Sequence, residues 1–433
     1  MIVIQSQRVV IDDRIESAAI VIQGERILEI TSYGHPDAID VGKAVILPGL
    51  VDSHVHLNEP GRTEWEGMAT GTAAAAAGGI TTLCDMPLNS SPVTTTREAL
   101  AEKRAAASGK LSVDVGFHGG VVPGNTQQIV ELLDGGVLGI KAFLCHSGID
   151  DFPNVGEREL REVMPLLAAR GVPLLAHAEI AEPTEPMTDP RRYADYLKTR
   201  PTSFEREAIE LLIDLCKRTG CPVHIVHLAD AGSVPMLRAA RASGLPITVE
   251  TCPHYLVFAA DEILDGATMF KCAPPIRDRE NREALWEAMR EGVIDMIASD
   301  HSPCPPAMKS LDAGRFDQAW GGISSLQLGL SVVWAEASKR GFAITDVVRW
   351  MSREPAKLLG LTRKIAVGQQ ADLVIFDDDN QWVVDGKALL HRHKVTPYDG
   401  RVVRGVVRQT MLRGAATKVG RGLTIDGRER LGQ

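Results

Sequence analysis

The stretch ILPGLVDSHVHL at residues 46–57 is the first of eight short apolar runs that decide the fold. Longer segments of helical composition separate each run from the next. Eight strands that alternate with helices over about 300 residues are typical of a (β/α)8 TIM-type barrel. A doubly wound open sheet is the alternative, but no Gly-rich phosphate fingerprint opens the first unit. The other runs are residues 81–87, 113–120, 139–144, 173–179, 223–228, 247–253 and 295–301.

The pattern outside these runs divides the chain into three parts. Segments between the runs, such as TTREALAEKRAAASG (95–109) and FEREAIELLIDLCKRTG (204–220), end in Gly, as helices often do. Both chain ends instead show short bursts of alternating apolar and polar residues, which predict half-buried strands. We therefore expect an α/β protein with a barrel at residues 49–360. A small β-sandwich domain is expected to form from residues 1–48 and 361–433.

Composition excludes several classes of function. The chain has 433 residues and a net charge of -9, and no basic run offers a surface for nucleic acid. No stretch of 18 or more apolar residues predicts a membrane span, and the first residues lack the pattern of a secretory signal. Seven thinly spread cysteines do not form a disulfide framework. We expect a cytoplasmic protein without a nucleic-acid or membrane partner.

Ligand-type side chains stand at the carboxyl ends of several runs. His54 and His56 are two residues apart near the end of the first run, so their imidazoles share one face of a strand. His177, His227 and Asp300 close three later runs. Because all strand ends of a barrel face the same mouth, these residues are expected to converge on a metal site. A single histidine in a strand is more often a hydrogen-bonded core residue, so the prediction rests on the set.

Lys141 stands among apolar residues in the run GIKAFL, where a buried ammonium group would be costly without a partner. Its ammonium group could instead reach solvent along an extended side chain. Beside a divalent metal site, a neutral amine could react with carbon dioxide to form an anionic carbamate, which offers two oxygen ligands. Asp300 has a second predicted role as the proton carrier of a hydrolysis reaction.

Several strings resemble motifs of the cyclic amidohydrolases of the amidohydrolase superfamily, and they span nearly the whole chain. The strings are HVHLNEPG, GGITTLCDMPLNS, GIKAFL, HAE, ETCPHYL, SDHSPC and GQQADLVIFD. The resemblance implies two divalent metal ions bridged by N6-carboxylated Lys141, with zinc expected first and cobalt, manganese or iron as alternatives. It assigns His54 and His56 to one ion, His177 and His227 to the other, and ligation plus proton transfer to Asp300.

Three activities compete within this family: those of dihydroorotases, of hydantoinases or dihydropyrimidinases, and of allantoinases. Dihydroorotases have three polar residues that suit a substrate carboxylate, and this chain has Asn58, Ala273 and Cys304 at those positions. A carboxylate substrate would therefore lose charge-assisted contacts of about 1.5 to 3 kcal/mol each. The strings NEPGRTEWEG, MPLNSSPVTT, SDHSPCPP and WGGISSLQ resemble the allantoinases. This resemblance implies hydrolysis of the hydantoin ring of allantoin to allantoate.

A neutral ureide rich in amide groups calls for polar rather than charged contacts. The expected substrate-binding residues are Asn89, Ser302, Asn58 and Cys272. A non-enzymatic subunit of the same family is a further alternative, although its relatives have usually lost ligands and this chain keeps all six. The resemblance also implies a homo-oligomer, with a tetramer expected.

Overall fold

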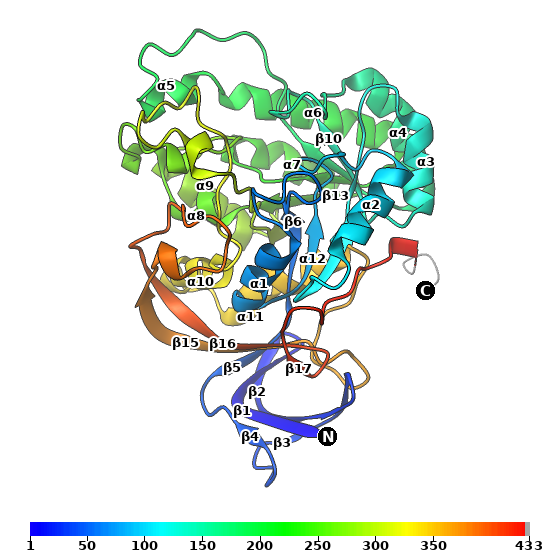
Figure 1. Cartoon of the computed structure of the whole chain (residues 1–433), viewed down its shortest axis with the longest axis vertical. Coiled ribbons are helices and arrows are strands. Elements are labelled where there is room, and N and C mark those ends of the chain that lie inside the picture. The colour runs from blue at the N-terminus through cyan, green and yellow to red at the C-terminus, as the bar shows by residue number, and fades with distance from the viewer. Residues whose placement is uncertain (429–433) are drawn as a thin grey trace.

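The computed structural model describes residues 1–428. All strands between residues 50 and 297 run parallel and form two sheets, of order β6-β7-β8 and β14-β13-β12-β11-β10-β9 (Figure 1). They confirm all eight predicted runs, of which the third is divided into β8 and β9. Their bounds are β6 (Leu50–Val55), β7 (Ile80–Asp85), β8 (Asp114–Phe117), β9 (Gly119–Gly120), β10 (Ile140–Phe143), β11 (Leu174–His177), β12 (Val223–Ile225), β13 (Ile247–Thr251) and β14 (Met296–Ile297).

Backbone hydrogen bonds link the two parallel sheets at both edges. At one edge the amide of Leu138, just before β10, donates to the carbonyl of Phe117 in β8 at 2.9 Å. At the other edge the amide of His56, just after β6, donates to the carbonyl of His301 at 2.9 Å. The carboxyl ends of the parallel strands therefore face one shared mouth.

The helices pack around the parallel strands and confirm the predicted helical segments. Thr96 immediately precedes α2, and its side chain accepts a hydrogen bond from the amide of Ala99 at 3.2 Å. Gly171 and Gly220 immediately follow α4 and α6 and take left-handed φ values of 61° and 69°. The helices are α1 (Met68–Ala77), α2 (Arg97–Ala107), α3 (Thr126–Asp134), α4 (Glu157–Arg170), α5 (Tyr193–Lys198), α6 (Thr202–Thr219), α7 (Val234–Ala242), α8 (Pro253–Val257), α9 (Arg279–Arg290), α10 (Gly329–Lys339), α11 (Ile344–Val348) and α12 (Glu354–Leu358), with a π-helical turn at 349–353.

The largest apolar core lies between these helices and the parallel strands. Ile129 of α3, Leu167 of α4 and Leu212 of α6 are fully buried in it. Burial of each such side chain contributes about 1.5 to 3 kcal/mol relative to exposure. Within the described chain, no helix has both the length and the apolar character needed to cross a membrane.

Strands from both chain ends form a third sheet beside the parallel ones (Figure 1). Its order is β17-β16-β15-β5-β1-β2-β3, with β4 paired to β1, so the two chain ends meet at β5. The pairing of the two ends is as predicted. All described terminal strands belong to this one sheet, so the expected sandwich of two facing sheets is not confirmed. The bounds are β1 (Ile2–Ile11), β2 (Arg14–Gln23), β3 (Arg26–Ser32), β4 (Ile39–Asp40), β5 (Val45–Pro48), β15 (Leu373–Val383), β16 (Val402–Leu412) and β17 (Ala415–Ala416).

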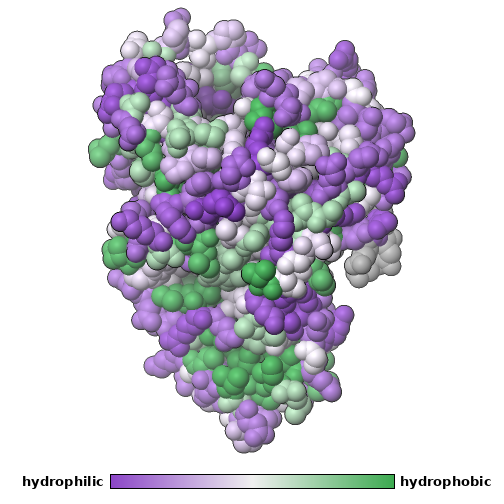
Figure 2. Space-filling view, in the orientation of Figure 1, coloured by the Kyte–Doolittle hydropathy of each residue, from purple (hydrophilic) through white to green (hydrophobic). Residues whose placement is uncertain are grey.

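A buried ion pair fastens the terminal sheet to the parallel strands. Arg413, just after β16, donates through Nη1 to both carboxylate oxygens of Asp114 at the start of β8, at 2.7 and 2.6 Å. Both side chains are almost fully buried. Ile2, Ile15 and Leu28 of the terminal sheet are exposed, and Figure 2 shows apolar side chains gathered at this end of the molecule.

Candidate metal centre

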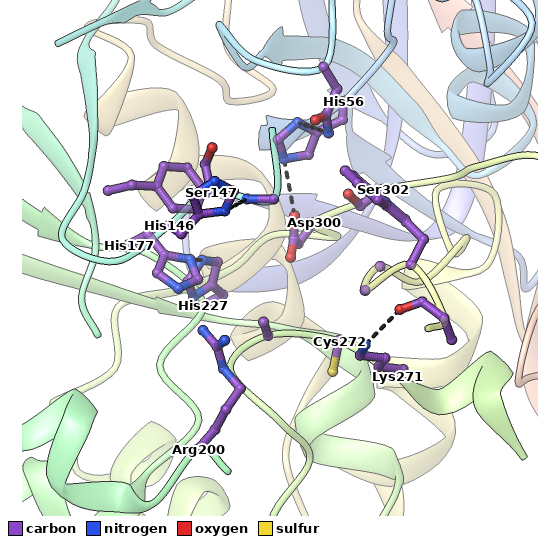
Figure 3. A pocket seen from close by; sticks show the side chains of 18 of the residues that line it. His56, His146, Ser147, His177, Arg200, His227, Lys271, Cys272, Asp300 and Ser302 are labelled. Atoms are coloured by element: carbon purple, nitrogen blue, oxygen red, sulfur yellow. Dashed lines mark hydrogen bonds and ion pairs between the residues drawn. The ribbon is translucent and has the colours of Figure 1, made fainter. Parts of the chain in front are cut away.

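A cavity of about 590 Å³ opens at the carboxyl ends of the parallel strands. The six residues predicted as metal ligands all line it, as Figure 3 shows for four of them. They come from five different strand ends, because each parallel strand delivers its last residues to the same mouth. They are His54 in β6, His56 just after it, Lys141 in β10, His177 at the end of β11, His227 after β12 and Asp300 after β14.

His54, His56 and Asp300 form the first group of converging donor atoms. Nε2 of His54 lies 3.2 Å from Oδ1 of Asp300, and Nε2 of His56 lies 3.4 Å from the same oxygen. Burial raises the pKa of Asp300, but the two imidazoles outweigh this effect and lower it to about 2. The group therefore presents a carboxylate and two imidazole nitrogens to one point, which is a donor set that suits a divalent metal ion.

His177 and His227 form a second group beside the first. Nδ1 of His177 and Nε2 of His227 face each other at 3.0 Å. Burial and the neighbouring His177 and Lys141 lower the pKa of His227 well below its ordinary value, which keeps that ring neutral. Two imidazole nitrogens that converge in this way offer a second point at which a cation could bind.

Lys141 is fully buried in the lining of the same cavity, and no residue of the described chain forms an ion pair with it. Its Nζ has no hydrogen-bond partner within residues 1–428. Burial lowers the pKa of Lys141 from 10.5 to about 8, although Asp300 and Glu250 act in the opposite direction. Lys103 is equally buried, but its ammonium group donates to Asp85 at 2.7 Å and to a carbonyl at 2.9 Å. The contrast shows that Lys141 lacks the compensation that a buried ammonium needs.

The candidate substrate-binding residues are placed in two different ways. Asn89, Ser302 and Cys272 line the cavity, and Nδ2 of Asn89 lies 3.5 Å from Nδ1 of His56. Asn58 is not among the lining residues; its amide points to the carbonyl of Pro303 at 3.4 Å, and its Oδ1 is buried without a partner in the described chain. Asn58, Asn89, His227 and Asp300 all have positive φ, and such unfavourable backbone conformations are typical of functional sites.

Two buried carboxylates that the sequence interpretation did not single out support the ligand histidines. Glu250 in β13 lies 2.5 Å from Nδ1 of His54, and Glu179 lies 2.7 Å from Nε2 of His177. Despite burial, His54 and His224 lower the pKa of Glu250, and Arg200 followed by His177 lowers the pKa of Glu179. Each carboxylate takes up one ring nitrogen and leaves the other directed at the cavity, which is the usual arrangement behind metal-binding histidines.

A model of the amidohydrolase family matches residues 45–417, which include the whole site. The chain belongs to the amidohydrolase family.

Other amidohydrolases resemble this one over nearly its full length. An allantoinase of Arabidopsis thaliana is 46% identical over 95% of this chain and 87% of its own. An allantoinase of Streptomyces avermitilis is 45% identical over 95% of this chain and 94% of its own. Among solved structures, an L-hydantoinase (dihydropyrimidinase) from Arthrobacter aurescens has a TM-score of 0.89 and 29% identity, and covers 98% of this chain and 99% of its own.

This amidohydrolase also contains a second set of donors, in which Cys145 and Glu179 lie close to His177. Arg200 already occupies this set: its Nε donates to Glu179 at 3.1 Å and its Nη2 lies 3.7 Å from the sulfur of Cys145. A metal ion there would have to displace or approach a guanidinium cation. We therefore assign the set to support of His177 rather than to a third metal site.

Proposed function

We propose that the protein opens the hydantoin ring of allantoin by hydrolysis and releases allantoate. The observation that carries the proposal is the convergence of six ligand-type residues in one cavity of about 590 Å³. The choice of substrate is supported by relatives named allantoinase, with 45–46% identity over 95% of this chain. The reaction is that of a cyclic amide hydrolase, in which water cleaves a ring C–N bond.

The donor chemistry of the cavity fits two divalent metal ions. His54 and His56 would hold one ion, His177 and His227 the other, and Asp300 would complete the first group. Lys141 would bridge them as the N6-carboxylated side chain, since its Nζ lies buried without a partner in the described chain. Nitrogen, carboxylate and carbamate ligands suit zinc, which we expect first, and also cobalt, manganese or iron.

The bound ions would supply a low pKa for the attacking water and polarisation of the ring carbonyl. The chain itself handles the proton. His54 and His56 lower the pKa of Asp300, so it is ionised at neutral pH. Its carboxylate can then accept a proton from the attacking water. It then returns that proton to the ring nitrogen as the C–N bond breaks.

Polar groups would hold the neutral ureide. Asn89, Ser302 and Cys272 line the cavity and can meet its amide groups through side chains or backbone. We propose that Asn58 acts indirectly, because its amide points to the carbonyl of Pro303, the residue after Ser302. No arginine takes the place of Asn58, so a substrate carboxylate would find no bidentate partner there.

The proposal extends to the architecture of the protein, its cellular compartment and its oligomeric state. We infer that the parallel strands close into a (β/α)8 barrel at residues 49–360, flanked by a β-sandwich domain from residues 1–48 and 361–433. The hydrogen bond between the amide of His56 and the carbonyl of His301 supports closure. All seven cysteines are free and buried, which supports a reducing compartment such as the cytoplasm. Family resemblance supports a homo-oligomer, with a tetramer expected.

Hydrolysis of hydantoins or dihydropyrimidines is the second candidate, favoured by structural likeness to the Arthrobacter aurescens enzyme with a TM-score of 0.89. Ring opening should be measured with allantoin, unsubstituted hydantoin, dihydrouracil and dihydroorotate on metal-replete protein. We expect turnover of allantoin to exceed that of the other three. Preference for one of the others would reassign the substrate, and inactivity on all four would favour a non-enzymatic subunit.

A further inference from the structure

One buried carboxylate contacts both halves of the proposed metal centre. Oε1 of Glu250 lies 2.5 Å from Nδ1 of His54 and 3.3 Å from the backbone amide of His227. Oε2 of the same side chain lies 3.0 Å from Nε2 of His224 and 3.4 Å from Oγ of Ser53. Four groups that can donate therefore surround the carboxylate, which is fully buried.

These contacts determine where the proton of His54 resides. An ionised carboxylate can only accept hydrogen bonds, so Nδ1 of His54 must carry the proton that faces Glu250. Nε2 then keeps its lone pair, and it is Nε2 that lies 3.2 Å from Asp300 in the cavity. The orientation and the tautomer that metal binding requires are both set before any ion arrives.

The same carboxylate acts on the second half-site through the backbone. The amide of His227 donates to Glu250, and His227 has a left-handed φ of 41°. A non-glycine residue in this conformation needs surrounding contacts to hold it. The turn directs the ring of His227 at His177, and its Nε2 lies 3.0 Å from Nδ1 of that residue.

We propose that Glu250 is a positioning residue that couples the two half-sites by fixing the tautomer of His54 and the turn at His227. The inference rests on the metal centre proposed above and is independent of the substrate. It also predicts what a side chain without an acceptor would do at this position. In Glu250→Leu nothing accepts from Nδ1 of His54 or from the amide of His227, so neither the tautomer of His54 nor the turn at His227 is fixed.

Metal binding separates this role from general packing. Zn2+ would be titrated into metal-free wild type, Glu250→Leu and Thr248→Val in competition with a chromophoric chelator. Thr248 is the matched control, because its hydroxyl lies 2.8 Å from Nδ1 of His224, on the side of that ring away from Glu250. We expect zinc affinity to fall 10- to 100-fold in Glu250→Leu and to stay near the wild-type value in Thr248→Val.

The tautomer gives a second readout that needs neither metal nor activity. In 15N spectra of the metal-free histidine rings, with the His54 signal identified by its loss in His54→Asn, wild type should show the Nδ1–H form and Glu250→Leu should not. Wild-type zinc affinity together with an unchanged His54 signal in folded Glu250→Leu would overturn the proposal. If Glu250→Leu does not fold, Glu250→Asp replaces it, and full zinc affinity in that variant would also contradict the proposal. Wild-type protein that binds no zinc would instead refute the metal centre itself.

Discussion

Carboxylation of Lys141 should depend on pH in a way that the burial of this lysine determines. Carbon dioxide adds only to the neutral amine, forming an N–C bond and releasing one proton. With a pKa of about 8, about a tenth of Lys141 is neutral at pH 7, whereas about 0.03% of a lysine with a pKa of 10.5 would be. Burial therefore raises the reactive fraction about 300-fold.

The assay follows 13C-labelled carbon dioxide into metal-free, acid-treated and refolded protein by NMR, at a fixed concentration of dissolved CO2. The initial rate should rise about tenfold per pH unit below pH 8 and level off above it, because deprotonation is then complete. Lys141→Ala should take up no label and lose tight metal binding, and a small added carboxylate should restore part of its activity. A rate that keeps rising through pH 10, or full metal occupancy in Lys141→Ala, would refute the reasoning.

Two further predictions concern proton transfer and the attachment of the terminal sheet. Asp300→Asn should keep the wild-type melting temperature but lose about 10²- to 10⁴-fold in kcat, because the amide cannot carry the proton; wild-type kcat would show that another group does so. Arg413→Ala should destabilise the fold by about 3 to 5 kcal/mol, because Asp114 is left as an unpaired buried charge. Urea unfolding measures the destabilisation, with the exposed Arg218→Ala as control. Equal unfolding midpoints for the two variants would contradict the prediction.

The strand pattern predicted most of the fold because short apolar runs separated by helical segments are typical of buried parallel strands. The run PLLAHAE contains β11, whose last residue is His177. The run DMIASDH contains β14, which ends at Ile297, three residues before Asp300. Once such runs are aligned, the geometry of parallel strands brings their ends together without further information. The facing sheets of a sandwich could not be predicted in this way, because alternation shows that a strand is half-buried but does not show which strands share a sheet.

The orientation of individual side chains was harder to predict than their position. Asn58 lies only two residues after His56, yet its left-handed φ of 62° turns its amide to the carbonyl of Pro303 and away from the cavity lining. Glu250 was overlooked for the opposite reason. A single glutamate in the strand ITVETCP reads as part of a motif, and nothing in the sequence tells that His54 and His224 lie on either side of it.

The same limit applies to the ligand histidines: the sequence indicates where each residue lies but not which of its atoms faces the cavity. A strand end fixes the Cα of a ligand residue, but an imidazole can still present either nitrogen and a carboxylate either oxygen. Buried acceptors remove that freedom: Glu250 leaves Nε2 of His54 open, whereas Glu179 leaves Nδ1 of His177 open. The two half-sites thus use different ring nitrogens, so replacing either carboxylate with leucine should weaken the half-site it touches even though every ligand residue is still present.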